Sequence, residues 1–117
     1  MIRALLFFLL LQLPALALSS EAEIQYLLGY IEESGCQFDR NGTVYDSQEA
    51  RAHIEMKYEY ARKWIDTTED FIEYTATESS MTGRPYHVVC DGRRMPSGKW
   101  LLDTLSAYRS SRVSAQQ

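Results

Sequence analysis

Hydrophobic residues recur at helical spacing in four parts of the chain, separated by polar or glycine-containing segments. The pattern predicts helices from Glu21 to Ser34, from about Asp46 to about Ile65, from Thr67 to near Glu78, and from Lys99 to about Tyr108. Their inward-facing residues are expected to be Ile24, Leu27, Leu28, Ile31, Ala50, Ile54, Tyr58, Ala61, Ile65, Phe71, Ile72, Ala76, Leu101, Leu102, Leu105 and Tyr108.

The boundaries of these helices are indicated by capping residues. A hydroxyl or carboxylate stands three positions before an acidic residue at each of the first three helices, as in a capping box. The pairs are Ser20 with Glu23, Asp46 with Glu49, and Thr67 with Asp70. Gly35 is placed to end the first helix.

Three short segments have the composition of β-strands. Cys36–Asp39 and Thr43–Tyr45 flank Asn41-Gly42, a strong hairpin signal, and Tyr86–Cys90 is β-branched and aromatic. We expect one of the first two segments to pair with the third, while 93–98 form a polar connection. The predicted fold is mainly α (α+β): four helices around one core, with a small two- or three-stranded β element tethered by a disulfide.

The N-terminal segment has the features of a Sec-type signal peptide. Arg3 precedes an apolar run, Pro14 interrupts it, and Ala15-Leu16-Ala17 is a small-x-small cleavage pattern. We expect residues 1–19 to be removed, with cleavage after Ala17 or Ser19, leaving a periplasmic protein without a membrane span. Residues 20–109 then form one globular domain and 110–117 a flexible tail.

Charge and cysteine content narrow the functional classes. The formal net charge is −4, and removal of Arg3 makes it one unit more negative, which argues against nucleic acid or an anionic membrane as partner. In an oxidising compartment Cys36 and Cys90 are expected to form a disulfide, which stabilises the fold by about 4 kcal/mol. A zinc site combining them with His53 and His87 lacks the usual ligand spacing, so we expect no metal and no cofactor.

The segment from Ser79 to Tyr86 is the longest interruption of the helical pattern that combines hydroxyls, glycine, a cation and proline. Gly83 can adopt a positive φ, and Pro85 makes the turn well defined. One interpretation is an anion-binding nest of backbone N–H groups beside Arg84. The alternative is a helix end followed by a purely structural turn.

A second polar line follows the long helix at i, i+4 and i+8: Glu49, His53 and Lys57. These side chains form either an exposed ladder of ion pairs or one wall of a cleft. The short connection at 66–68 is expected to send the chain back along this helix, which brings the 79–86 loop to His53. Ser79 or Ser80 with His53 and Glu49 is the one combination that resembles a nucleophile and base, and no established catalytic motif accompanies it.

Several of these residues resemble the pattern of the YfeK-like family, small exported proteins of Gram-negative bacteria classed as a domain of unknown function. The most specific part is the string from Ser79 to Tyr86, with Ser-Ser-x-Thr-Gly-Arg-Pro-Tyr. The resemblance extends from about the first helix to the last, and implies a periplasmic address without an activity. The other matching positions are Arg40-Asn41-Gly42, Tyr45, Glu49-Ala50, His53, Lys57, Ile65-Asp66-Thr67, Glu69, Phe71-Ile72 and Val88.

The leading hypothesis is therefore a small, non-enzymatic periplasmic protein that binds an envelope component or another protein through a polar cleft. One alternative is a hydrolase or transferase that uses a Ser79 or Ser80 hydroxyl with His53; another is a structural envelope protein without a ligand. No catalytic residue is assigned. The candidate binding residues are Arg40, Asn41, Glu49, His53, Lys57, Ser79, Ser80, Thr82, Arg84 and Tyr86.

Overall fold

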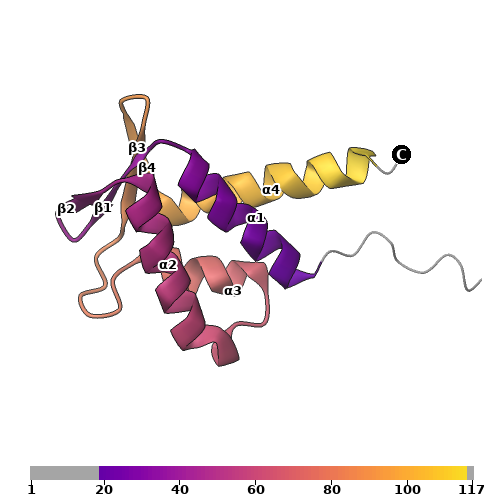
Figure 1. The fold of residues 1–117 in the computed structure, drawn as a ribbon, viewed down its shortest axis with the longest axis horizontal. Helices are drawn as coiled ribbons and strands as arrows, with labels where there is room; N and C mark the ends of the chain where they lie inside the picture. The colour runs from indigo at the N-terminus through magenta and orange to yellow at the C-terminus, as the bar shows by residue number, and fades with distance from the viewer. Residues whose placement is uncertain (1–18, 116–117) are drawn as a thin grey trace, which may run out of the picture.

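The structure, a computed structural model, describes residues 19–115, which contain four α-helices and a four-stranded sheet (Figure 1). The signal-peptide prediction for 1–19 falls outside these residues except at Ser19. The helices are α1 (Ser20–Glu33), α2 (Ser47–Ala61), α3 (Thr68–Ile72) and α4 (Ser97–Ala115), with a 3-10 turn η2 (Arg62–Trp64) and a π-helical turn η3 (Glu73–Thr77). The strands are β1 (Gln37–Arg40), β2 (Thr43–Tyr45), β3 (His87–Cys90) and β4 (Arg93–Pro96).

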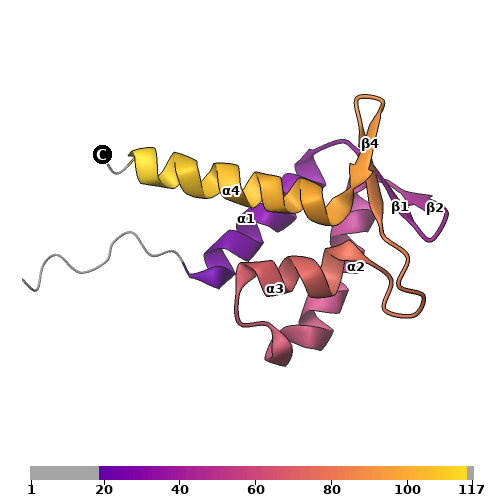
Figure 2. The same cartoon turned by 180° about the vertical axis from the view of Figure 1, so that it is seen from behind.

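The helices pack on one core, with the sheet at one end of them (Figures 1 and 2). α1 contacts α2, α3 and α4, and η3 continues α3 between α2 and α4. Most of the predicted inward-facing residues are buried, including Phe71, which is fully enclosed. Leu102 was wrongly assigned to the core: it is 45% exposed, because α4 buries the neighbouring line of Leu101 and Leu105 instead.

The predicted caps of α2 and α3 are confirmed as complete capping boxes, from Asp46 with Glu49 and from Thr67 with Asp70. At α1 the cap lies one residue earlier than expected. The Ser19 hydroxyl, and not that of Ser20, accepts the hydrogen bond from the backbone N–H of Ala22. Ser20 instead donates to the Asp66 carbonyl.

The sheet is antiparallel, with strand order β2-β1-β3-β4. The first of the two expected pairings is confirmed, since Phe38 on β1 lies opposite Val88 on β3. Both side chains are buried on the face toward the helices, and His87 belongs to the other face, because side chains alternate along a strand.

The fourth strand was not expected. Residues 93–96 were predicted to be a polar connection, but they pair along β3 as an edge strand that ends at Pro96, a position where proline is tolerated. Asp91 and Gly92 both have positive φ, at 53° and 78°, as Asn41 and Gly42 do in the first hairpin. The Asp-Gly dipeptide thus forms the same kind of two-residue turn as Asn-Gly.

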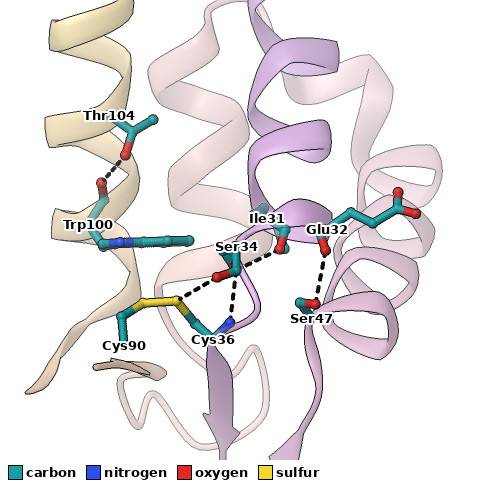
Figure 3. The surroundings of a disulfide bond; sticks show 8 residues. All are labelled: Ile31, Glu32, Ser34, Cys36, Ser47, Cys90, Trp100 and Thr104. Carbon is teal, nitrogen blue, oxygen red and sulfur yellow. Dashed lines mark hydrogen bonds between the residues drawn. A yellow bond between two sulfur atoms is a disulfide. The ribbon is translucent and has the colours of Figure 1, made fainter. Parts of the chain in front are cut away.

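The predicted disulfide is present and joins Cys36 to Cys90, with a Cα–Cα distance of 4.7 Å (Figure 3). Continuing the register of β1 and β3 by one position places the two cysteines opposite each other. The bond therefore ties the segment that follows α1 to the end of β3, and the zinc alternative that needed both thiolates is not formed.

The last helix is longer than the sequence pattern indicated. It continues past Tyr108 to Ala115 (Figure 2). Its side chains from Ser110 to Ala115 are exposed. The flexibility of 110–117 stays a prediction. Across residues 19–115 the helices all fall short of the length and apolar character that a membrane crossing requires.

Candidate functional site

Two cations converge on one tyrosine where the loop before β3 passes α2. Tyr86 is 5% exposed, and its hydroxyl lies 3.3 Å from Arg40 Nη2 and 3.4 Å from Lys57 Nζ. Both cations also lie over its ring, with Arg40 Cζ at 4.9 Å and Lys57 Nζ at 5.1 Å from the centroid. Arg40 comes from the end of β1, Lys57 from the second half of α2, and Tyr86 from the loop before β3, so three segments build this centre.

The two cations have no anionic partner within residues 19–115. Ion pairs in that range involve other cations, and the hydrogen bonds of the Arg40 and Lys57 side chains go to Tyr86. Burial by itself raises the pKa of the Tyr86 hydroxyl, but Arg40 and Lys57 outweigh it, and the pKa lies below its ordinary value. A half-buried pair of like charges with no counter-ion is electrostatically unfavourable, and an anion placed there is stabilised.

His53 lies beside this centre, one turn before Lys57 on α2. Its ring meets the Tyr45 ring edge to face at a centroid distance of 4.6 Å. Arg40 Cζ lies over the same Tyr45 ring, 5.7 Å from its centroid. Burial, followed by the charge of Arg40, lowers the pKa of His53, against an opposing effect of Glu49. His53 is therefore a neutral hydrogen-bonding group at neutral pH, and Arg40 and Lys57 carry the positive charge.

The 79–86 loop is a closed turn whose backbone donors are used internally. The Ser79 hydroxyl accepts hydrogen bonds from the N–H groups of Met81 and Thr82, and the N–H groups of Gly83 and Arg84 go to the Ser79 carbonyl and the Thr82 hydroxyl. Gly83 has the expected positive φ of 73°. The anion nest proposed from the sequence is wrong, because the amides that would form it already have partners.

The loop nevertheless reaches the predicted neighbours. Thr82 Oγ1 donates to Asn41 Oδ1 at 3.3 Å, which joins the loop to the β1–β2 turn, while Tyr86 joins it to Lys57. The expected meeting of the loop with the α2 edge is thus confirmed at Lys57. Exposed Asn41 and Thr82 form a polar rim near the half-buried cations.

The remaining candidate residues hold the backbone or are exposed on the loop. The Glu49 carboxylate accepts the N–H of Asp46 in the capping box of α2, and Ser80 and Arg84 are exposed on the loop. Ser79 is buried and serves the turn. In the described part of the chain neither Ser79 nor Ser80 makes a hydrogen bond with His53.

Space beneath the cations is small. Arg40 and Tyr86 border a narrow void of about 10 Å³ that is closed on the inside by core residues such as Phe38 and Leu101. A void of this size has room for one water molecule at most, so a ligand would lie on the surface above the cations and not inside the core. Among residues 19–115 no three His, Cys, Asp or Glu side chains gather as metal ligands.

The sequence analysis groups Arg40, Lys57 and Tyr86 in one candidate cleft, and the structure brings the three together, but the contact of both cations with the Tyr86 hydroxyl was not predicted. The sequence signal for it was weak: Arg40 lies next to the hairpin turn and Lys57 lies on the polar line of α2. Tyr45 was noticed as a family position and not as part of the site, where it supplies an aromatic wall.

Comparison with known proteins places the chain in a family. The model of a family of unknown function (DUF5329) matches residues 18–109. The uncharacterized protein YfeK of Salmonella typhimurium is 40% identical over 82 residues, which cover 67% of this chain and 68% of YfeK. No solved structure matches. The residues that match the family model include the region with the YfeK-like pattern, and the chain therefore belongs to the DUF5329 family of unknown function.

Proposed function

We propose that this protein is a non-enzymatic periplasmic binding module that holds an oxyanion, a carboxylate or phosphate group of an envelope component, between Arg40 and Lys57. The observation that carries the proposal is the pair of half-buried cations on the Tyr86 hydroxyl without an anionic partner in residues 19–115. Other cations of residues 19–115 also lack an ion pair, but they are exposed, whereas Arg40 and Lys57 are half-buried. Arginine and lysine are the residues that proteins use for such anions.

The surroundings fit binding better than turnover. Neutral His53 and the Asn41–Thr82 rim offer hydrogen bonds around the cations, and Tyr86 is held in place by both of them. The enzymatic alternative with Ser79 or Ser80 lacks a contact between hydroxyl and imidazole, and Ser79 Oγ is occupied by two backbone donors. The remaining alternative is a structural envelope protein without a ligand. The experiment below separates it from the binding proposal.

Export is part of the proposal. The apolar N-terminal run and the disulfide support a periplasmic address. Of the two cleavage positions, we favour the one after Ala17, because cleavage after Ser19 removes the hydroxyl that caps α1.

The experiment is a thermal unfolding series of the mature protein in chloride, acetate and inorganic phosphate at one ionic strength. An anion that binds only the folded state raises the unfolding midpoint with concentration. We expect acetate or phosphate to do so for the wild type and not for Arg40→Gln. Equal midpoints in all three salts, or an equal rise in the variant, would support the structural alternative.

A further inference from the structure

A second hollow lies where the end of α1, the turn between β3 and β4, and the start of α4 meet. It has a volume of about 410 Å³ and is lined by Tyr30, Trp100, Glu33, Asp91, Ser34 and the Cys36–Cys90 disulfide. Figure 3 shows Ser34, Trp100 and the disulfide. This volume lies in the range of small-molecule sites. The hollow shares no lining residue with the Arg40 site.

Two aromatic rings form part of its wall. The Tyr30 and Trp100 centroids are 5.1 Å apart with the ring planes at 46°, and Trp100 is held from below by the edge of Phe38 at 5.6 Å. Tyr30 is 38% exposed, so a solvent-facing aromatic surface remains beside a fixed Trp100. Such rings attract cations through their faces.

The charges around the rings have the sign that a cation requires. Glu33 is in the last turn of α1, a turn that contains no basic residue, although the negative end of the helix dipole favours a cation there. Asp91, in the turn between β3 and β4, also lines the hollow. Neither carboxylate takes part in an ion pair in residues 19–115, whereas Glu32, the neighbour of Glu33, is paired with Arg51 at 2.6 Å.

An adjoining hollow of about 430 Å³ shares Cys90, Asp91 and Trp100 with this one and is also lined by the basic residues Arg93 and Arg94. Arg94 in that hollow is paired with Asp39 at 3.0 Å. Arg93 is exposed there and has no ion pair with Asp91 in the described part of the chain. The aromatic hollow is therefore left with two carboxylates, a helix C-terminus and two rings that all favour a positive charge.

We propose that this hollow, termed the Trp100 hollow, binds an organic cation: an ammonium or guanidinium group placed against Tyr30 and Trp100 and neutralised by Glu33 and Asp91. The group can belong to a lysine or arginine side chain of a protein partner or to a free polyamine. Both sources share the same recognition chemistry, and the probes below separate them.

The test uses the mature, disulfide-bonded protein with Trp64→Phe, so that Trp100 is the single tryptophan fluorophore after signal removal. Trp64 is 54% exposed and lies outside the hollow, which makes this change mild. Blocked lysine (Nα-acetyl-lysine methylamide), blocked arginine and putrescine are titrated at constant ionic strength. Blocked norleucine is the uncharged comparator. Trp100 fluorescence and its indole N–H resonance are both recorded.

We expect a saturable change with at least one cation and none with norleucine, and a loss of affinity of about fivefold or more in Glu33→Gln and in Asp91→Asn. Asn tolerates the positive φ of residue 91, so the second variant keeps the turn. Glu73→Gln, on η3, is the matched control and should bind as the parent does. Preference for the blocked amino acids indicates a protein partner, and preference for putrescine a free polyamine.

The proposal is overturned if neither signal changes with any cation, if norleucine binds equally, or if the Glu33 and Asp91 variants keep full affinity. Binding of an uncharged disaccharide, titrated in parallel, without binding of the cations would also overturn it and would assign the aromatic wall to a sugar. These outcomes are independent of the acetate and phosphate experiment.

Discussion

Arg109 on α4 donates two hydrogen bonds of 2.8 Å to Glu23 on α1, from Nε to Oε2 and from Nη2 to Oε1, although 86 positions separate the residues. Glu23 is only 5% exposed, and Thr68 on α3 donates to it as well. Arg109 also reaches Glu69 on α3 at 2.8 Å. One guanidinium thus joins three helices and neutralises a buried carboxylate.

Removing this guanidinium should destabilise the domain. Arg109→Ala leaves Glu23 buried without its counter-ion, and we expect a loss of about 2 kcal/mol in the free energy of unfolding. This is less than for a fully enclosed pair, because Arg109 itself is 42% exposed. Urea unfolding measures the loss.

Lys99→Ala is the matched control on the same helix. Lys99 pairs with Asp103 at 2.9 Å, but both side chains are more than 60% exposed, so its loss should cost less than about 1 kcal/mol. Equal destabilisation by the two variants would contradict the role given to Arg109.

The contacts of Arg109 with Glu23 and Glu69 also make the stability of the fold depend on pH in the acid range. Hydrogen bonds from Arg109 lower the pKa of Glu23, against an opposing effect of burial, and they also lower the pKa of Glu69. In the unfolded chain both carboxylates titrate near the ordinary value of about 4.3. The unfolded state therefore binds more protons as the pH falls, and the stabilisation present above that value is lost as the pH drops through the lower native values.

Unfolding of the wild type and Arg109→Ala is measured between neutral pH and about pH 3. Glu21, Asp39 and Asp70 also have lowered pKa values, so both proteins should lose stability in acid. The difference between them should shrink as the pH falls. A difference that stays constant over the whole range would show that the charges of Glu23 and Glu69 are not involved.

The local patterns of the sequence were sufficient for the helices and for part of the sheet. Apolar spacing and the Asp46 and Thr67 caps placed α2 and α3, and the cysteine pair correctly indicated that β1 and β3 are neighbours. β4 was missed because two arginines begin it and a proline ends it, which leaves Met95 as its one apolar residue. An edge strand needs little apolar side-chain burial, and the Asp91-Gly92 turn was its one signal.

Long-range polar contacts could not be predicted in the same way. The spacing of Glu49, His53 and Lys57 described one helix face, but it did not indicate which charges would find partners. The Glu49 carboxylate accepts a hydrogen bond in the cap of its own helix. Lys57 and Arg40 both contact the hydroxyl of Tyr86, which lies on a third segment. Nothing local to Glu23 or Arg109 indicated their pairing either, since it depends on how α1 and α4 cross.

The disulfide should contribute a large share of the stability. Cys36 and Cys90 are 54 positions apart, and closing a loop of that size stabilises a folded domain by about 4 kcal/mol in the chain-entropy model. We expect Cys36→Ser/Cys90→Ser to lower the free energy of unfolding by about that amount. Thiol titration of the denatured, non-reduced wild type should find no free thiol. Two reactive thiols per chain, or unchanged stability in the double variant, would contradict the bond or its role.

Lys57 is expected to matter for binding and not for folding. Lys57→Met removes a half-buried charge that lies close to Arg40, and the loss of its contact with the Tyr86 ring costs about 0.5–1 kcal/mol. The two effects oppose each other, so the unfolding midpoint without added oxyanion should be unchanged or slightly raised.

Lys63→Met is the control for that comparison. Lys63 Nζ lies 4.7 Å from the centroid of the Trp64 ring on η2, a similar cation–ring contact at an exposed position. Denaturant unfolding of both variants measures the effect. A loss above about 2 kcal/mol in Lys57→Met alone would make Lys57 a structural residue instead.

The most direct test of the oxyanion site is calorimetric titration of inorganic phosphate into the mature wild type, Lys57→Met and Lys63→Met at constant ionic strength. If Arg40 and Lys57 form the site, the wild type and Lys63→Met bind one phosphate per chain with the same affinity, and Lys57→Met shows no saturable heat. A repeat with acetate extends the result to carboxylates. Absence of saturable heat in the wild type with both anions, or identical binding by all three proteins, would contradict the proposed function.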